Sequence, residues 1–499
     1  MARSSRTRRL PACDRYPVRA EVRPGEPDTR IVAKYDLVVL GTGPAGEKGA
    51  AQAAYFEKRV AIVDPNPRPG GIAVSTAGIP TKTLREGAIY LFGLGQSATG
   101  AAPTSVQDPW RLLTARKLEV SEFMIKAVER NLLRHGIERI CGRARLLPGR
   151  RVEVEKGSGE RVVIEADVVL LATGSRPGHP RGIPMDDPDV HDSENILEIE
   201  ALPPSILVIG GGALGCEYAS IFAALGVQVT IVDAASHLLP ALDVEMARVL
   251  AESFNSIGIR VIPGISVSSV AREGDGLEIR LADGRTLRAK KVLIAAGRRP
   301  EIEGLGLAEA GVEIDSRGWV QVDDRYATTA PGVFAAGDVI GPLGLASMAM
   351  EQARVAVCHA FGFEYKKDTD RFRPRYVFSI PEAAWVGLTE EEARASGISY
   401  EVGRSSFGTN AKARISGFPD GLIKLVFEVP DKTLLGVHIV GELASEIIHI
   451  GQFVMHEGGT IDRFIDATFA VPTRSESYKY AAYDGLMRLP RRTRSKTAG

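Results

Sequence analysis

The sequence predicts an α/β fold with two Rossmann-like dinucleotide-binding domains, followed by a C-terminal α+β domain. Two observations carry this prediction. A short apolar strand, a Gly-x-Gly-x-x-Gly turn and a helix follow one another twice, and after about residue 375 the pattern changes to alternating strands. The length of 499 residues agrees, because about 150 residues per domain leaves room for three domains.

The first repeat has every part of a βαβ dinucleotide-binding unit. Its expected elements are a strand over 35–40, the turn glycines Gly41, Gly43 and Gly46, a helix over 47–57, and a strand over 59–63 that ends in Asp64. In such a unit the first glycine permits the turn, the second lets the backbone approach a pyrophosphate, and the third allows close packing of the helix. The helix N-terminus adds a positive partial charge.

The second repeat has the same order. Its expected elements are a strand over 206–209, the glycines Gly210, Gly212 and Gly215, a helix to about Leu225, and a strand over 227–232 that ends in Asp233. One such motif alone could be a tight strand-to-helix turn, but two complete units are specific. We expect Asp64 and Asp233 each to bind an adenosine ribose. Two nucleotides imply electron transfer between them, with flavin the usual tightly held partner of an exchangeable nicotinamide.

Short apolar strands that end in glycine motifs are expected to complete the two sheets. They cover 168–171 before Thr173 and Gly174, 292–294 before Gly297, and 332–334 before Asp338. In the C-terminal domain we expect strands over 384–386, 422–428 and 434–440, with amphipathic helices over 445–455 and 476–489.

The composition narrows the classes of partner. Lys plus Arg is 62 and Asp plus Glu is 62, so the net charge is +0 and nucleic acid is not an expected partner. The most apolar stretch, 205–232, contains Glu217 and Gln228 and changes its period, so no membrane span is expected. Four cysteines far apart predict neither a disulfide framework nor a metal site, which favours a reducing, cytoplasmic location.

From Tyr35 to about Leu489 the chain resembles the flavoprotein disulfide reductase superfamily, the class I pyridine nucleotide-disulfide oxidoreductases. Within it the chain is most similar to the soluble pyridine nucleotide transhydrogenases. The resemblance rests on both glycine motifs, Gly70-Gly71, the segment 78–85, Ala172 to Ser175, Glu217, the segment 296–300, Gly337-Asp338, and the segment 469–476.

The resemblance implies FAD on the first glycine motif and a nicotinamide nucleotide on the second. Gly71, Thr173 and Gly174 would line the FAD site, Asp338 would bind the flavin ribityl chain, and Gly297 would lie at the nicotinamide site. The expected layout is a basic disordered extension over 1–33, an FAD domain over 34–176 and 301–375, an NAD(P) domain over 177–300, a dimerisation domain over 376–490, and a basic tail over 491–499. The family also implies a homodimer, in which the segment 469–476 closes the partner's flavin site.

The residues of thiol chemistry are absent at both places where the family has them. The family's two redox cysteines correspond to Ala73 and Gly78, and its catalytic histidine corresponds to Val471, while the partner of that histidine remains as Glu476. No dithiol can form between Ala73 and Gly78, so a lipoamide or glutathione reductase is excluded.

Lys82 and Glu217 remain at motif positions, where the resemblance implies an ion pair beside flavin N5. Such a fixed positive charge favours the reduced flavin. Ser347 is a candidate N-cap of the helix expected after Asp338. Cys216, next to Glu217, has no basic or thiol neighbour in the sequence and is interpreted as a packed apolar residue.

These residues are compatible with three alternative functions. The first is an FAD-dependent NAD(P) transhydrogenase, in which hydride passes between nicotinamide nucleotides without a redox disulfide. The second is an NADH-specific diaphorase or quinone reductase, because Asp233 is followed by Ala234-Ala235-Ser236-His237 and favours NAD(H) over NADP(H). Arg298 or His237 could hold a 2′-phosphate instead. The third, a degenerate nucleotide-binding scaffold, is disfavoured because Lys82, Glu217 and Asp338 are all present.

Overall fold

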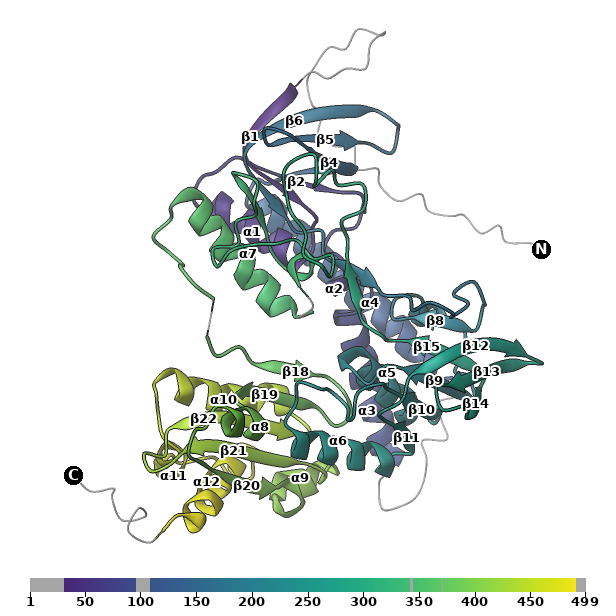
Figure 1. Cartoon of the computed structure of the whole chain (residues 1–499), viewed down its shortest axis with the longest axis vertical. Helices are drawn as coiled ribbons and strands as arrows, with labels where there is room; N and C mark the ends of the chain where they lie inside the picture. Colours follow the sequence, from purple (N-terminus) through teal and green to yellow (C-terminus); the bar gives the residue numbers. More distant parts are fainter. Residues whose placement is uncertain (1–30, 96–107, 342–343, 370, 491–499) are drawn as a thin grey trace, which may run out of the picture. The chain divides into compact units, whose positions relative to one another are not determined.

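The computed structural model describes residues 31–95, 108–341, 344–369 and 371–490. The chain forms two compact units (Figure 1). The first unit comprises Met1–Ser75, Ser121–Arg176 and Arg298–Thr369, and the second comprises Thr76–Val120, Pro177–Gly297 and Asp370–Gly499. The fold class predicted from the sequence is confirmed. Within the described residues, no helix combines the length and the apolar character needed to cross a membrane.

The first unit is built on a seven-stranded sheet with β1 and β6 at its centre. Strands β3, β2, β1, β6 and β17 are parallel to their neighbours, while β5 and β4 add an antiparallel edge. The strands are β1 (Ile31–Leu40), β2 (Val60–Asp64), β3 (Glu138–Cys141), β4 (Arg143–Leu147), β5 (Arg151–Glu155), β6 (Arg161–Leu171) and β17 (Val333–Ala335).

Strand β1 begins at Ile31 rather than at Tyr35, where the apolar run begins. The cause lies in β6, which extends back to Arg161 and offers backbone partners to the earlier residues, so that Ile31 pairs with Val163. A partner strand thus lengthens β1 beyond the segment that its own side chains predict.

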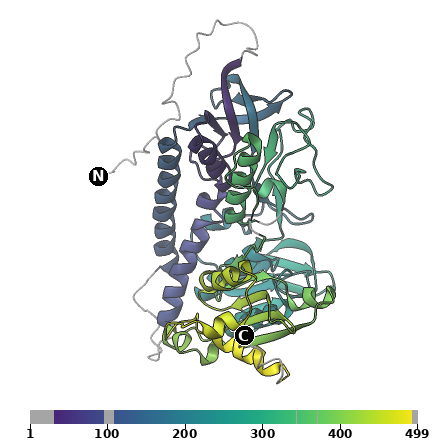
Figure 2. The same cartoon turned by 90° about the vertical axis from the view of Figure 1, so that its left-hand side faces the viewer.

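The helices of the first unit are α1 (Pro44–Tyr55), α2 (Ile72–Ser75), α7 (Ala346–Phe361) and the part of α4 (Pro109–Arg134) that follows Val120, with the 3₁₀ turn η2 (Asp338–Ile340). Helices α1 and α7 pack on the parallel strands. Figure 2 shows α4 as one long, uninterrupted helix. Helix α7 begins at Ala346 with Leu345 as its N-cap residue. The expectation that Ser347 caps this helix is wrong, because Ser347 lies inside its first turn.

The second unit contains a five-stranded parallel sheet in the order β11-β10-β9-β15-β8. These strands are β8 (Val190–Asp192), β9 (Ser205–Ile209), β10 (Gln228–Val232), β11 (Ile259–Ile262) and β15 (Lys291–Ile294). The helices of this part are α3 (Ile79–Gly95), α5 (Ala213–Ala224) and α6 (Val244–Ser256), with the 3₁₀ turn η1 (Asn195–Glu198).

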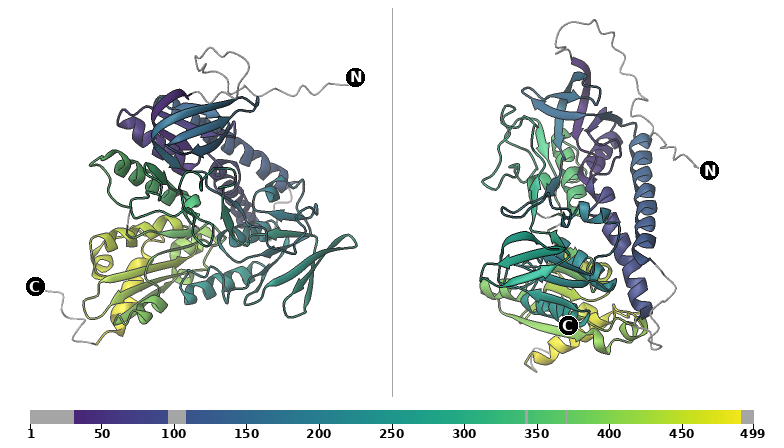
Figure 3. Two further views of the ribbon diagram at one scale, coloured as in Figure 1. Left: turned by 45° about the horizontal axis from the view of Figure 1, so that its top comes forward. Right: turned by 90° about the vertical axis from the view of Figure 1, so that its right-hand side faces the viewer.

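Two smaller sheets accompany the parallel ones. An antiparallel sheet of β12 (Val267–Glu273), β13 (Gly276–Leu281) and β14 (Thr286–Ala289) appears in teal in Figure 3. Strands β7 (Ser175–Pro177) and β16 (Arg298–Pro300) form a two-stranded sheet.

The C-terminal part of the second unit is α+β, as predicted. Its antiparallel sheet has the order β18-β19-β22-β21-β20, made of β18 (Arg375–Val377), β19 (Ala383–Gly387), β20 (Tyr400–Ser406), β21 (Leu422–Glu428) and β22 (Leu434–Val440). Its helices are α8 (Glu390–Ala395), α9 (Ala411–Ser416), α10 (Ala444–His456), α11 (Asp462–Asp466) and α12 (Ser477–Arg488), with the 3₁₀ turn η3 (Phe407–Thr409).

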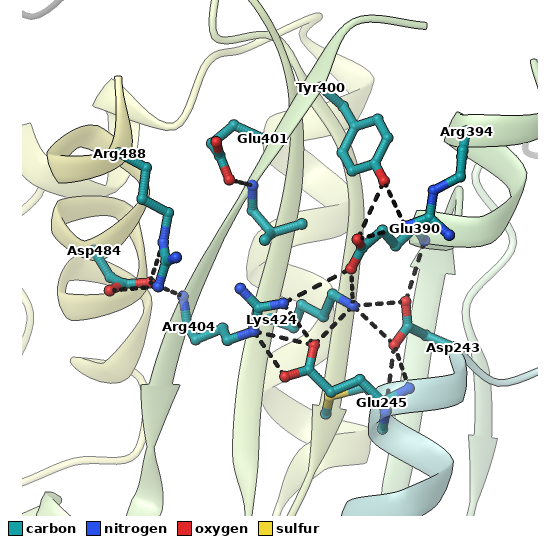
Figure 4. Close-up of polar contacts among 12 residues, drawn as sticks. Asp243, Glu245, Glu390, Arg394, Tyr400, Glu401, Arg404, Lys424, Asp484 and Arg488 are labelled. Carbon is teal, nitrogen blue, oxygen red and sulfur yellow. Dashed lines mark hydrogen bonds and ion pairs between the residues drawn. The ribbon is translucent and has the colours of Figure 1, made fainter. Parts of the chain in front are cut away.

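A buried charge cluster joins helix α6 to this antiparallel sheet (Figure 4). The ammonium of Lys424, whose side chain is 0% exposed, contacts the carboxylates of Asp243 at 3.0 Å, Glu245 at 2.9 Å and Glu390 at 2.7 Å. Asp243 is also the N-cap of α6 and accepts hydrogen bonds from two backbone N–H groups of that helix. The start of α6 is therefore fixed to strand β21 by a cation that three anions share.

Candidate functional site

The first glycine turn needs two of its three glycines for its own packing. Gly41 has a φ of +105°, and a Cβ there would lie 2.4 Å from the carbonyl oxygen of Ala172. A Cβ on Gly46 would lie 1.8 Å from the carbonyl oxygen of Gly41. Both substitutions would clash with backbone, so these glycines hold strand and helix in contact.

Gly43 has no such internal reason to be glycine. Its φ of −63° is open to any residue, and a Cβ there would meet nothing within 4 Å. The missing side chain leaves open space directly before the N-terminus of α1, where a phosphate is favoured. A Cβ on Gly71 would lie 2.9 Å from the Cα of Gly43, so the two predicted FAD residues are neighbours.

Further parts of the first unit fit a bound dinucleotide. The hydroxyl oxygen of Thr173 is buried and has no hydrogen-bond partner among the described residues. Gly174, next to it, has a φ of +77°, and a Cβ there would meet nothing within 4 Å. A buried polar atom without a partner is costly, which a ligand would relieve. These features fit the FAD that the resemblance implies.

Asp64 contacts the glycine turn itself. Its Oδ2 accepts hydrogen bonds from the backbone N of Thr42 at 2.7 Å and from the Thr42 hydroxyl at 2.6 Å, and its Oδ1 accepts one from the backbone N of Asn66 at 2.8 Å. The carboxylate that was predicted to bind ribose therefore also fixes the turn beside it.

Asp338 lies at the end of a short polar chain that the sequence did not predict. Its Oδ2 accepts a hydrogen bond from the Ser175 hydroxyl at 2.7 Å, and the hydroxyl oxygen accepts one from Nε of Arg298 at 2.7 Å. Nη2 of Arg298 also donates to the Ser175 carbonyl oxygen at 2.6 Å. Ser175 directly follows the predicted Thr173 and Gly174, which was the available signal. Arg298, considered above as a phosphate ligand, makes these bonds within the first unit.

The second glycine turn repeats the first in detail. Gly210 has a φ of +111°, and its Cβ would lie 2.5 Å from the carbonyl oxygen of Ala295, while a Cβ on Gly215 would lie 1.9 Å from the carbonyl oxygen of Gly210. Gly212 again has an ordinary φ of −75°, and a Cβ there would meet nothing within 4 Å. Gly297 has a φ of +103° with open space around the position of a Cβ.

The carboxylate of Asp233 accepts hydrogen bonds from the backbone N of Gly211 and, at 2.7 Å, from that of Ala235. The segment 234–242 contains no Lys or Arg. In it Nδ1 of His237 lies 3.0 Å from the carbonyl oxygen of Leu238. A fixed carboxylate without a basic neighbour suits a ribose hydroxyl better than a phosphate.

Lys82 and Glu217 form the ion pair that the resemblance implies. Nζ of Lys82, on α3, lies 2.7 Å from Oε2 of Glu217, on α5. The Glu217 side chain is 5% exposed, and its Oε1 accepts a hydrogen bond from the backbone N of Phe378 at 3.0 Å. The ammonium also lies 5.1 Å from the centre of the Phe378 ring. No sequence signal pointed to Phe378, because it follows Glu217 by 161 positions.

Cys216 is fully buried, and its thiol donates to the carbonyl oxygen of Gly211 at 3.3 Å. Burial raises the pKa of the Cys216 thiol far above its ordinary value. This agrees with the interpretation of Cys216 as a packed residue, because a protonated thiol is a poor nucleophile.

In the segment 469–476, Val471 is 73% exposed and Glu476 is buried. Nδ2 of Asn410 contacts Oε1 of Glu476 at 3.4 Å. The carboxylate therefore has an amide neighbour in this chain.

The family model described as pyridine nucleotide-disulphide oxidoreductase matches residues 35–359. The chain belongs to this family. The dimerisation-domain model of the same family matches residues 373–482. The pyridine nucleotide-disulphide oxidoreductase assignment makes the chain an FAD-dependent enzyme that uses nicotinamide nucleotides, and its dimerisation domain supports self-association.

Relatives of known name cover nearly the whole chain. The soluble pyridine nucleotide transhydrogenase of Mycobacterium tuberculosis (strain ATCC 25177 / H37Ra) is 39% identical over 460 residues, which are 91% of this chain and 98% of the relative. That of Pseudomonas aeruginosa (strain LESB58) is 35% identical over 473 residues, 92% of this chain and 99% of the relative.

Two solved structures have the same fold. LpdA from Mycobacterium tuberculosis superposes with a TM-score of 0.83 at 30% identity, over 90% of this chain and 99% of that chain. The HOCl-induced flavoprotein disulfide reductase RclA from Escherichia coli superposes with a TM-score of 0.82 at 29% identity, again over 90% and 99%.

Proposed function

We propose that this chain is an FAD-dependent pyridine nucleotide transhydrogenase, which passes hydride from one nicotinamide nucleotide to another. The observation that carries the proposal is the pair Gly43 and Gly212. Each lies before a helix in an ordinary backbone conformation with open space where a side chain would lie. One chain with two such openings suits two dinucleotides. The names of the transhydrogenase relatives support the same function.

The chain's own residues have distinct tasks in this reaction. When bound, FAD supplies a centre that takes up a hydride and gives it back. The backbone around Gly43, with Thr173 and Asp338, would hold FAD, and that around Gly212, with Asp233, would hold the nicotinamide nucleotide. Lys82 would supply a fixed positive charge, and Glu217 would keep its ammonium in place.

We also infer that the reaction proceeds without a redox disulfide. Residues 73 and 78, at the family's cysteine positions, are alanine and glycine, and residue 471, at the histidine position, is valine. Among the described residues, the cysteines are Cys141, Cys216 and Cys358, and all are free. Without a dithiol, hydride transfer depends only on how the two nucleotide sites position their ligands.

Asp233 favours a second candidate, an NADH-specific diaphorase or quinone reductase. Its carboxylate is held by two backbone N–H groups, and the segment after it has no basic residue to bind a 2′-phosphate. A transhydrogenase must also accept NADP(H), whereas a diaphorase need not.

Anaerobic stopped-flow reduction of the purified protein separates these functions. Flavin bleaching at about 450 nm is followed with NADH and NADPH in parallel. Fast bleaching by both nucleotides, reversed by either oxidised nucleotide, is the expected result. Bleaching by NADH alone would favour the diaphorase, and an FAD-loaded protein that neither nucleotide reduces would contradict both.

We further propose that the enzyme works in the cytoplasm, which the free cysteines support.

A further inference from the structure

The segment 378–382, between strands β18 and β19, contacts the two helices that hold the Lys82–Glu217 pair. On α5, Oε1 of Glu217 accepts a hydrogen bond from the backbone N of Phe378 at 3.0 Å. One turn later on the same helix, the Ser220 hydroxyl oxygen accepts one from the backbone N of Ile380, also at 3.0 Å. Two side chains at helical spacing on α5 thus bind alternate residues of one segment.

Helix α3 makes matching contacts with the same segment. The Lys82 ammonium lies over the Phe378 ring at 5.1 Å from its centre. Three residues later, Nε of Arg85 donates to the carbonyl oxygen of Ser379 at 3.1 Å, and its Nη2 lies 2.8 Å from Oε1 of Glu382. The segment is therefore held from both helices at once.

The Arg85–Glu382 pair is the buried part of this arrangement. Each side chain is 5% exposed. Nη1 of Arg85 lies 2.5 Å from Oε1 of the exposed Glu86. The second oxygen of Glu382 accepts a hydrogen bond from the backbone N of Ser445, at the start of α10, at 2.8 Å. A buried guanidinium whose nitrogens bind both the backbone and a carboxylate of one segment fixes geometry more firmly than an exposed ion pair does.

We propose that Arg85 and Glu382 are positioning residues, which hold segment 378–382 so that it fixes the Lys82–Glu217 pair for hydride transfer. This proposal rests on the proposed function, because it assigns Lys82 the charge that assists the flavin. The Glu217 carboxylate has two partners, Lys82 and the backbone of Phe378, and the second is in place only while the segment is held. Loosening Glu382 would therefore let the ammonium of Lys82 move, although neither residue of the buried pair would touch the flavin.

The test compares Glu382→Gln and Arg85→Met in the FAD-loaded protein, alone and combined with Lys82→Met. The first readout is the midpoint potential of the bound flavin, measured by dye-mediated reduction without a nucleotide. The second is kcat and KM with NADH. We expect both single variants to lower the potential and to reduce kcat about tenfold, with KM changed less than about twofold. In the Lys82→Met background, neither substitution should change the flavin potential or kcat any further.

A matched control separates positioning from stability. Asp462→Asn removes the carboxylate from another poorly exposed ion pair of the second unit, Lys432–Asp462, which is 2.5 Å long. It should lower the melting temperature without moving the flavin potential. If Glu382→Gln behaves like this control, or if its effect adds to that of Lys82→Met, the positioning role is overturned. Should nicotinamides fail to reduce the wild type, the dye-measured potentials still decide the role of Glu382.

Discussion

Gly43 and Gly212 occupy equivalent places in the two glycine turns, each directly before a helix and each with room for a side chain that the chain does not use. Their φ angles of −63° and −75° would suit alanine. The neighbouring glycines of both turns are required by backbone contacts, whereas these two are required only by a ligand that approaches the backbone.

Gly43→Ala and Gly212→Ala should therefore fold normally but lose different ligands. We expect Gly43→Ala to bind FAD at least about tenfold more weakly, and Gly212→Ala to keep FAD while its KM for NADH rises about tenfold, each a change of about 1.4 kcal/mol. Flavin absorbance after gel filtration and steady-state kinetics measure the two effects. Gly157→Ala, at a turn glycine with equally open space, is the control and should change neither. A loss of FAD in Gly212→Ala would show that the two turns are not independent.

Lys82→Met tests the charge beside the flavin directly. The ammonium that lies 2.7 Å from Glu217 would be lost, and we expect flavin reduction by NADH to slow by about 10²-fold, as when one electrostatic contact is removed from an active site. Stopped-flow absorbance gives the rate. Lys291→Met, which removes a lysine paired with Asp189 at 2.7 Å in the same unit, should leave that rate unchanged. Equal rates for Lys82→Met and the wild type would remove Lys82 from the mechanism.

The two glycine turns were predictable from the sequence because each is encoded within a few consecutive residues. The strand, the turn, the helix and the acidic residue of a βαβ unit have fixed spacing, so their roles follow from local pattern. Phe378 and Glu382 were not predictable, since their contacts with Glu217 and Arg85 depend on how distant elements pack. Ser347 was misplaced as a cap because α7 begins at Ala346, with Leu345 as an N-cap residue that offers no capping side chain.

The burial of Lys424 was likewise not predictable from the sequence. In a sheet strand such as β21, a single lysine among apolar residues indicates a side chain that faces solvent. The structure instead buries it completely, because Asp243 and Glu245 of α6 and Glu390 of α8 surround its ammonium. Only the packing of α6 and α8 against this sheet reveals those anions, because all three lie far from Lys424 in the sequence.

Lys424→Met should destabilise the protein strongly. The variant leaves Asp243, Glu245 and Glu390 without the shared cation, and removing one partner from a buried cluster costs about 3–5 kcal/mol. Thermal and denaturant unfolding at pH 7 measure the loss. Lys126→Met, which breaks an exposed pair with Glu122, is the control and should cost less than about 1 kcal/mol. Similar losses in both variants would mean that the buried cluster contributes no more than a surface pair.

The pH dependence of stability should change sign in the same variant. In the wild type, burial opposes ionisation of Asp243, Glu245 and Glu390, but Lys424 and its cationic neighbours outweigh burial and lower the pKa of all three carboxyls. This stabilisation is present above the ordinary carboxyl pKa of about 4 and is lost as pH falls below it. Without Lys424, burial opposes ionisation of Asp243 and Glu390, whereas Glu245 keeps its contacts with Arg404. Through Asp243 and Glu390, Lys424→Met should therefore gain stability as pH falls from neutral toward the ordinary carboxyl pKa of about 4. Unfolding curves across that range decide it, and parallel curves for the two proteins would contradict the assignment.

Thiol reagents should not inactivate the enzyme, whether or not it has been reduced. A disulfide reductase exposes a reactive dithiol after reduction, but in this chain the family's two cysteine positions are occupied by Ala73 and Gly78. Burial also raises the pKa of Cys216 and Cys358, which keeps both thiols protonated near neutral pH. We therefore expect iodoacetamide at pH 8 to label the same cysteines with and without NADH, and activity to persist. Mass spectrometry of the alkylated protein identifies the labelled residues, and a cysteine that reacts only after NADH is added would reveal thiol redox chemistry in this chain.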